Sequence, residues 1–224
     1  MTEYKEVTIS GMTLEYRKWK VRDKMELDRI ETDSNLSTTE KQIQKRKVFV
    51  YNCLKEPVIL DLEQYNYVLS LIREYSLHTP IEFTLECSSC QEQFSTTLST
   101  PEIITFREPE YKDISVGGLT FSFGNVRSPE YDRDILESFS ASERFIVDLA
   151  HHVTELNGEE VQPREVIDAL QDMDVDDYQE LFRLYDSQRA LCNFRRAVKC
   201  PHCENTDFYE FDNLTSFFPQ SWSV

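Results

Sequence analysis

Two Cys-x-x-Cys pairs, Cys87/Cys90 and Cys200/Cys203, constrain this chain more than any other feature of its sequence. A tight turn with this spacing places two thiolates on the same side, where they can take two corners of a metal tetrahedron with metal–sulfur bonds near ~2.3 Å. A second turn of the same kind completes a shell of four thiolates. Because a closed shell leaves no position for water or substrate, the pattern predicts a structural, non-catalytic Zn²⁺ held by these four cysteines.

A long insertion separates the two pairs. The 109 residues between Cys90 and Cys200 far exceed the ~15–20 of a compact zinc motif. The entropy of loop closure grows only logarithmically with length, so such an insertion is tolerable. Apolar residues alternate over 81–98 around the first pair, and strand periodicity returns at about 193 around the second. We therefore expect two hairpins, each with a cysteine pair at its turn, to form a zinc-ribbon-like antiparallel β region.

Two other interpretations of the cysteines remain open. A thioredoxin-like dithiol is one, although no βαβ pattern surrounds either pair. Unliganded thiols are the other. The two remaining cysteines, Cys53 and Cys192, are expected to be buried small apolar residues.

Hydrophobic periodicity organises the rest of the chain into an α+β fold. Residues 1–20 are expected to form a hairpin and 22–31 a short helix, before a polar linker at 32–39. Capping signatures at Ser37 and Asp61 predict two further helices, the second over 62–76. The predicted domains are an N-terminal hairpin and helix (1–31), a linker and helices (32–80), the β region (81–127 plus 193–217), a helical insertion (128–192) and a C-terminal tail (218–224).

The insertion at 128–192 is expected to be all-helical. Ser128 with Pro129 predicts the start of its first helix. Ser142 predicts the start of a second, which would run through Leu156 and end at Asn157-Gly158. Two more helices are expected before about 192.

The charge of the chain restricts its partners. Its 224 residues carry 41 acidic and 24 basic side chains, for a formal net charge of −17. A surface this acidic repels phosphate backbones and anionic lipids, so we expect neither nucleic acid nor a membrane as a partner. Five glycines in all leave no nucleotide-binding loop. The N-terminal segment lacks the basic and apolar regions of a signal peptide, so synthesis in the cytoplasm is expected.

No catalytic constellation is evident, so an enzyme is not expected. His151 and His152 are adjacent on a predicted helix, where they face different directions; a pair with Asp148 is conceivable, but packing is the favoured interpretation. The acidic run at 172–177 lacks the glycine and distal glutamate of an EF-hand loop, and helix capping explains it better. The basic cluster at 41–47 is interpreted as a solvated helix face, with a docking patch for an acidic partner as the alternative.

The order of these elements resembles a known family. A helix like 62–76, a strand like 81–86, a Cys-x-x-Cys pair, a hydroxyl-rich strand like 94–98 and a late Cys200-Pro-His-Cys203 followed by 213–219 are similar to the baseplate hub and hub-assembly proteins of T4-like contractile-tailed phages. The resemblance runs from about Ser10 to the C-terminus. It implies a subunit retained in the virion hub or a factor that only assembles it.

The sequence thus predicts a structural or assembly protein that docks on other baseplate hub and tail proteins, without a small-molecule substrate. It would act in the host cytoplasm during assembly, and in the virion tail baseplate if retained. The aromatic residues Phe217, Phe218 and Trp222 near the C-terminus are candidate partner contacts, with packing on their own domain as the alternative. The alternative functions are a zinc-ribbon adaptor that binds proteins of nucleic-acid machinery and, less favoured, a dithiol oxidoreductase.

Overall fold

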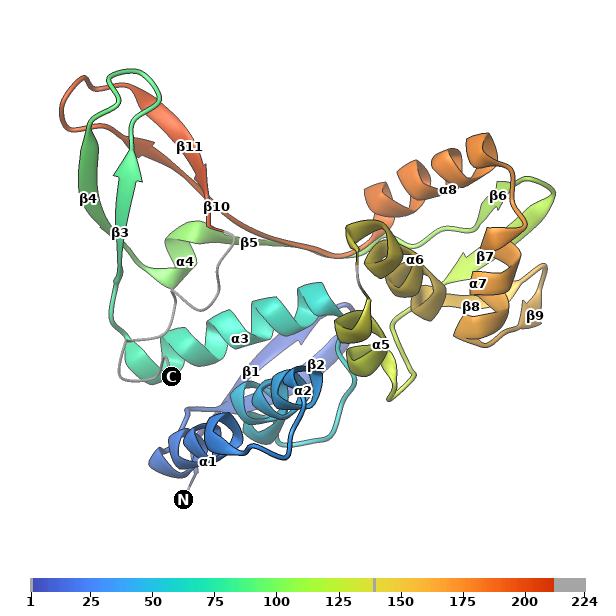
Figure 1. Ribbon diagram of the computed structural model, residues 1–224, viewed down its shortest axis with the longest axis horizontal. Helices are drawn as coiled ribbons and strands as arrows, with labels where there is room; N and C mark the ends of the chain where they lie inside the picture. Colours follow the sequence, from blue (N-terminus) through green and yellow to red (C-terminus); the bar gives the residue numbers. More distant parts are fainter. Residues whose placement is uncertain (1, 139, 212–224) are drawn as a thin grey trace.

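The computed structural model describes residues 2–138 and 140–211. Figure 1 shows three parts: an N-terminal region (residues 2–77), a ribbon arm of projecting hairpins (81–107 and 191–211) and a helical lobe (111–190). All strand pairs are antiparallel, and they form small separate sheets beside the helices. The predicted α+β class is confirmed.

The N-terminal region begins with the predicted hairpin and continues with helices. Its elements are β1 (Tyr4–Ile9), β2 (Met12–Arg17), α1 (Val21–Thr32), α2 (Thr38–Phe49), the 3₁₀ helix η1 (Tyr51–Cys53) and α3 (Leu62–Leu77). Both predicted caps are present: the Ser37 side chain accepts from the backbone N–H of Glu40 at 3.2 Å, and Asp61 accepts from that of Gln64 at 2.7 Å. The hairpin packs with α3 around a core of Ile9, Tyr16, Trp19, Val68 and Ile72.

The ribbon arm combines chain segments from before and after the insertion. Its elements are β3 (Ile81–Glu86), β4 (Gln93–Leu98), α4 (Thr100–Ile103), β5 (Ile104–Arg107), β10 (Leu191–Lys199) and β11 (Thr206–Glu210). The first half of β10 pairs with β5 and its second half with β11, while β3 and β4 pair only with each other. In Figure 1 the two hairpins rise together above α3. The strand pairing predicted around each cysteine pair is confirmed.

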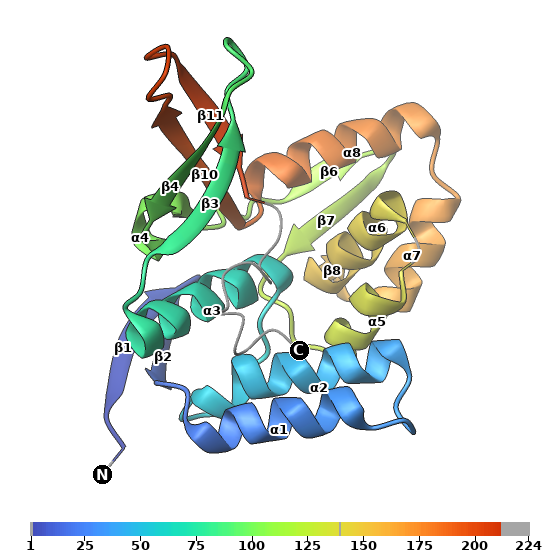
Figure 2. The same cartoon turned by 60° about the vertical axis from the view of Figure 1, so that its left-hand side comes forward.

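The helical lobe contains a sheet as well as helices. Its elements are β6 (Ile114–Val116), β7 (Leu119–Phe123), α5 (Tyr131–Glu137), α6 (Ala141–His152), β8 (Val153–Leu156), β9 (Glu159–Glu160), α7 (Pro163–Gln171) and α8 (Val175–Gln188). The strands form one sheet in the order β6-β7-β8-β9, and the core lies between this sheet and α6, α7 and α8. Figure 2 shows α8 along the outer edge of the lobe.

The prediction of an all-helical insertion is wrong at 153–160. Val153 and Leu156 continue the helical spacing of α6, but they lie in β8, which pairs with β7, and Asn157-Gly158 is the turn into β9. Hydrogen bonding to β7, a strand that precedes the insertion, overrides the local period. Strands β6 and β7 therefore join this sheet and not the ribbon strands.

Two predicted helix starts are also wrong by a few residues. Ser140, not Ser142, caps α6, since its side chain accepts from the backbone N–H of Glu143 at 3.0 Å. Helix α5 begins at Tyr131, after a turn that contains Ser128 and Pro129. Serine suits an N-cap at either position, so residue type alone does not distinguish Ser140 from Ser142. Among the described residues, no helix combines the length and apolarity needed to span a membrane.

Candidate metal centre

The two cysteine turns have the same backbone geometry. In the first, the N–H of Cys87 donates to the carbonyl of Glu92 (3.1 Å), and the N–H of Gln91 donates to the carbonyl of Cys87 (2.9 Å). The second turn repeats both bonds around Cys200, at 2.8 and 3.0 Å. Each turn closes a strand pair, so the local sequence fixes where its two sulfurs point.

The structure brings the four predicted cysteines together. Their sulfur atoms all lie within 4.8 Å of one another. The Sγ atoms of Cys87 and Cys203 are 3.6 Å apart, and those of Cys90 and Cys200 are 3.8 Å apart. A tetrahedron with metal–sulfur bonds of ~2.3 Å has sulfur–sulfur edges of ~3.8 Å, and a disulfide would bring two sulfurs to ~2.05 Å. The spacing is therefore close enough for the four sulfurs to hold one metal ion, and too wide for a disulfide.

The electrostatics of the cluster favour a cation. Although burial opposes ionisation, hydrogen bonds from the backbone N–H groups of Cys203 and His202 lower the pKa of the Cys200 thiol to about 7. The pKa of Cys90 is raised to about 12: a backbone hydrogen bond near Glu92 lowers it, but desolvation and the three neighbouring thiols outweigh that effect. Four adjacent thiols cannot all ionise against their mutual repulsion, and a divalent ion bonded to all four removes that penalty.

Contacts beside the sulfurs join the same two hairpins. The backbone N–H and hydroxyl of Ser88 donate to the carboxylate of Asp207 at 3.0 and 2.8 Å. The hydroxyl of Tyr209 donates to the carbonyl of Glu86 at 3.0 Å. The rings of Phe94 and Tyr209 meet edge to face, with centroids 6.4 Å apart. These contacts orient the turns, so that the cluster closes the outer end of the ribbon arm.

One residue after each pair adopts a strained backbone conformation. Gln91 has φ of 60° and Glu204 φ of 61°, in the left-handed region that glycine occupies without steric cost. Replacing either with glycine is expected to raise the free energy of unfolding by about 0.5–1 kcal/mol, since relief of ~1–2 kcal/mol of strain exceeds the added entropy of the unfolded chain. Thermal unfolding of Gln91→Gly and Glu204→Gly measures this.

The matched control is Glu92→Gly, because Glu92 lies in the same turn without a positive φ. That variant is expected to lower stability by about 0.4–1 kcal/mol through unfolded-state entropy alone. Equal effects at Gln91 and Glu92 would show that the strain argument is wrong.

The other residues singled out from the sequence make contacts that belong to the fold. Cys53 and Cys192 are buried, as predicted, and burial raises the pKa of the Cys53 thiol to about 12. In the basic cluster, Lys45 pairs with Glu31, and Arg46 pairs with Asp132 at 2.7 Å. The interpretation of this cluster as a solvated helix face is therefore wrong for Arg46, whose side chain lies largely buried against the Tyr65 ring, and it holds for Lys47, which is exposed. In the acidic run, Asp174 occupies the N-cap position of α8.

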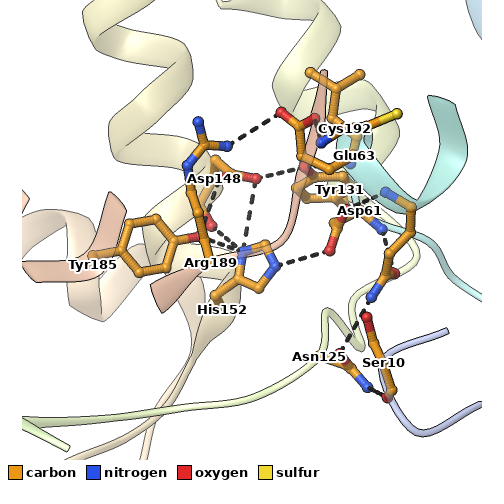
Figure 3. Close-up of polar contacts among 12 residues, drawn as sticks. Ser10, Asp61, Glu63, Asn125, Tyr131, Asp148, His152, Tyr185, Arg189 and Cys192 are labelled. Atoms are coloured by element: carbon orange, nitrogen blue, oxygen red, sulfur yellow. Dashed lines mark hydrogen bonds and ion pairs between the residues drawn. The ribbon is translucent and has the colours of Figure 1, made fainter. Parts of the chain in front are cut away.

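His152, which sequence analysis assigned to packing, is the centre of a second polar cluster. It is buried at the end of α6 (Figure 3), where its Nδ1 lies 2.8 Å from the hydroxyl of Tyr185 and its Nε2 lies 3.4 Å from Asp61. Asp148 accepts hydrogen bonds from the hydroxyls of Tyr131 (2.6 Å) and Tyr185 (3.0 Å). Desolvation opposes protonation of His152, but the two carboxylates dominate and raise its pKa to about 9.

This polar cluster connects the helical lobe to the N-terminal region. Asp61 caps α3, and the hydroxyl of Tyr131 accepts from the backbone N–H of Leu62 at 3.1 Å. Beside it, Arg189 lies 3.3 Å from Glu63. The buried imidazolium of His152 and its tyrosine partners satisfy one another's hydrogen-bonding groups. The arrangement is therefore suited to holding two parts of the fold together. Asp61 and His152 are 91 residues apart, and no local spacing signals their contact.

Comparison with known protein families shows what the chain is similar to. The family described as T4 bacteriophage base plate protein matches residues 1–219. No curated protein and no solved structure gives a significant match. The candidate partner contacts Phe217, Phe218 and Trp222 lie outside the described residues and stay a prediction.

Proposed function

Because the chain belongs to the T4 bacteriophage base plate protein family, we propose that it is a structural or assembly protein of the central hub of a contractile phage tail. It docks on other baseplate proteins and has no enzymatic turnover. The family match over nearly the whole chain is the observation that carries this function. The protein would act at the baseplate during assembly in the host cytoplasm, and it would be part of the virion tail if it is retained.

A structural Zn²⁺ on Cys87, Cys90, Cys200 and Cys203 is part of the proposal. The close approach of the four sulfur atoms, two pairs of which lie 3.6 and 3.8 Å apart, supports it. With all four positions filled by thiolates, the ion would have no site for substrate or water. Its function would be to join the hairpin that precedes the insertion to the hairpin that follows it, which keeps the ribbon arm in one shape for docking.

Binding to individually purified baseplate proteins of the same phage tests the docking function. We expect the full chain to form a stable complex with at least one of them in size-exclusion chromatography, and to leave the capsid protein of that phage unbound as a control. Mass spectrometry of purified virions then separates a retained subunit, which is present, from an assembly factor, which is absent. A chain that binds none of the baseplate proteins would contradict the proposed function.

A further inference from the structure

The acidity of the chain is concentrated in one part of the fold. Residues 1–80 carry 13 acidic and 13 basic side chains, whereas residues 128–192 carry 17 acidic and 5 basic ones. The helical lobe therefore holds most of the formal net charge of −17. A surface with one dominant sign attracts partners of the opposite sign and repels others.

Within the lobe, α8 presents apolar side chains to solvent. Val175 is 69% exposed and Phe182 is 39% exposed. They are seven residues apart, which is two turns or ~10.5 Å along the helix, so they lie on nearly the same stripe. The ring of Phe182 packs against Phe145 of α6, with centroids 3.9 Å apart. Figures 1 and 2 show α8 on the outside of the lobe, away from the N-terminal region.

Carboxylates flank the N-terminal end of this apolar stripe, next to Val175. Asp172, Asp174 and Asp176 are exposed where α7 gives way to α8, and none of them has an ion-pair partner among residues 2–138 and 140–211. Arg183, on the same helix, is paired with Glu180 at 2.6 Å. Asp174 and Asp176 lie at the N-terminus of α8, where the helix dipole favours anions, but the Asp174 side chain makes no capping hydrogen bond. The dipole does not explain why Val175 and Phe182 on the same helix are exposed.

We propose that the outer face of α8, formed by Val175 and Phe182 with Phe145 and the carboxylates of Asp172, Asp174 and Asp176, is the surface that docks on a basic protein of the baseplate. The inference rests on the proposed function and names its surface. Arginine or lysine side chains of the partner would pair with the carboxylates, and an arginine can stack on the exposed phenylalanine ring.

A second copy of this chain would bind poorly to the outer face of α8. Like charges repel across any contact between two such lobes. The basic cluster on α2 is largely occupied within its own chain, since Lys45 pairs with Glu31 and Arg46 with Asp132. Lys41 donates to the carbonyl of Glu31 at 2.7 Å. A basic heterologous protein surface therefore fits the face better.

The test uses the baseplate protein that binds the full chain, with Kd measured by calorimetry at 50 and 300 mM NaCl. We expect Val175→Ser with Phe182→Ser to raise Kd at least 10-fold. The triple variant Asp172→Asn, Asp174→Asn, Asp176→Asn is expected to raise Kd about as much at low salt and to reduce the salt dependence. No capping hydrogen bond is lost, because the Asp174 side chain makes none.

Matched control variants show which surface is responsible for the change in Kd. Phe208→Ser removes an aromatic residue that is 73% exposed on the ribbon arm, and it is expected to leave Kd unchanged. The set Phe217→Ser, Phe218→Ser, Trp222→Ser tests the C-terminal aromatics in the same way. Unaltered thermal unfolding shows that each variant is folded.

The possible results distinguish a failure of the proposed docking face from a failure of the proposed baseplate function. Normal affinity of the α8 variants, or a loss confined to Phe208 or to the C-terminal aromatics, overturns the docking face and leaves the baseplate function standing. Self-association through α8, detected by sedimentation of the free chain, also overturns it. Failure of the unaltered chain to bind any baseplate protein overturns both.

Discussion

Replacing Cys203 with serine is expected to lower the zinc content from about one ion per chain to near zero and the free energy of unfolding by about 3–5 kcal/mol. Cys203 is exposed, and an exposed substitution that breaks no special interaction changes stability by only about ±0.5 kcal/mol. A large loss at this position therefore comes from the metal and not from packing. Metal analysis by mass spectrometry and denaturant unfolding measure the two effects.

The comparison with other cysteines sharpens this prediction. Cys200→Ser, at a buried ligand, should match Cys203→Ser in zinc loss. Cys53→Ala is the control: it removes a buried thiol outside the cluster, so it should cost some stability while leaving zinc at one per chain. Unaltered protein that carries no zinc and shows four reactive thiols in the arm would contradict the metal site.

Replacing His152 with glutamine is expected to lower the free energy of unfolding by about 3–5 kcal/mol at pH 7, because it leaves the buried carboxylate of Asp61 and the partly buried carboxylate of Asp148 without their cation. The same variant should remove a pH dependence. Attraction to these carboxylates outweighs desolvation and raises the pKa of His152 from 6.5 to about 9. A group with a raised pKa stabilises the fold fully below its unfolded value and loses that contribution as pH rises through its folded value.

The contribution of His152 is the difference in unfolding free energy between the unaltered protein and His152→Gln, and it should fall by about 3 kcal/mol between roughly pH 6.5 and 9. Cys200, whose pKa of about 7 places its titration in the same range, is common to both proteins and cancels in this difference. The neighbouring hydroxyls of Tyr111, Tyr131 and Tyr185 do not ionise in this window, because burial raises the pKa of each. Denaturant unfolding at several pH values measures the slope. His78→Asn, at an exposed helix end with φ of 51°, is the control and should keep it. A difference between the two proteins that stays constant over this pH range would exclude this account.

The cysteine cluster could be predicted from sequence because each half is local. Cys87 and Cys90 share one turn, alternating apolar residues mark the strands on both sides, and Cys200-Pro-His-Cys203 repeats the arrangement. To predict that the two turns meet, only one further assumption is needed: two metal sites with two thiolates each complete one another. Capped helices such as α3 were predictable for the same reason, since Asp61 and Gln64 are three residues apart.

Long-range pairing was not predictable in this way. Val153 and Leu156 fit a helical period as well as a strand, and only their register opposite Phe123 and Phe121 of β7 places them in β8. The contact of His152 with Asp61 depends on how the helical lobe meets α3, which no periodicity encodes. A pair with Asp148 was conceivable from the helical spacing, whereas the contacts of His152 with Asp61 and Tyr185 were not.

The separation of the two cysteine turns has a consequence for synthesis. A ribosome adding about 5–20 residues per second needs roughly 5–20 s to pass from Cys90 to Cys200. During that interval the first hairpin can offer only two sulfurs, and two thiolates hold a metal ion far less firmly than four. The nascent chain must therefore complete most of the helical lobe before its arm can close, and until then Cys87 and Cys90 are open to oxidation. Metal capture would be among the last steps of folding.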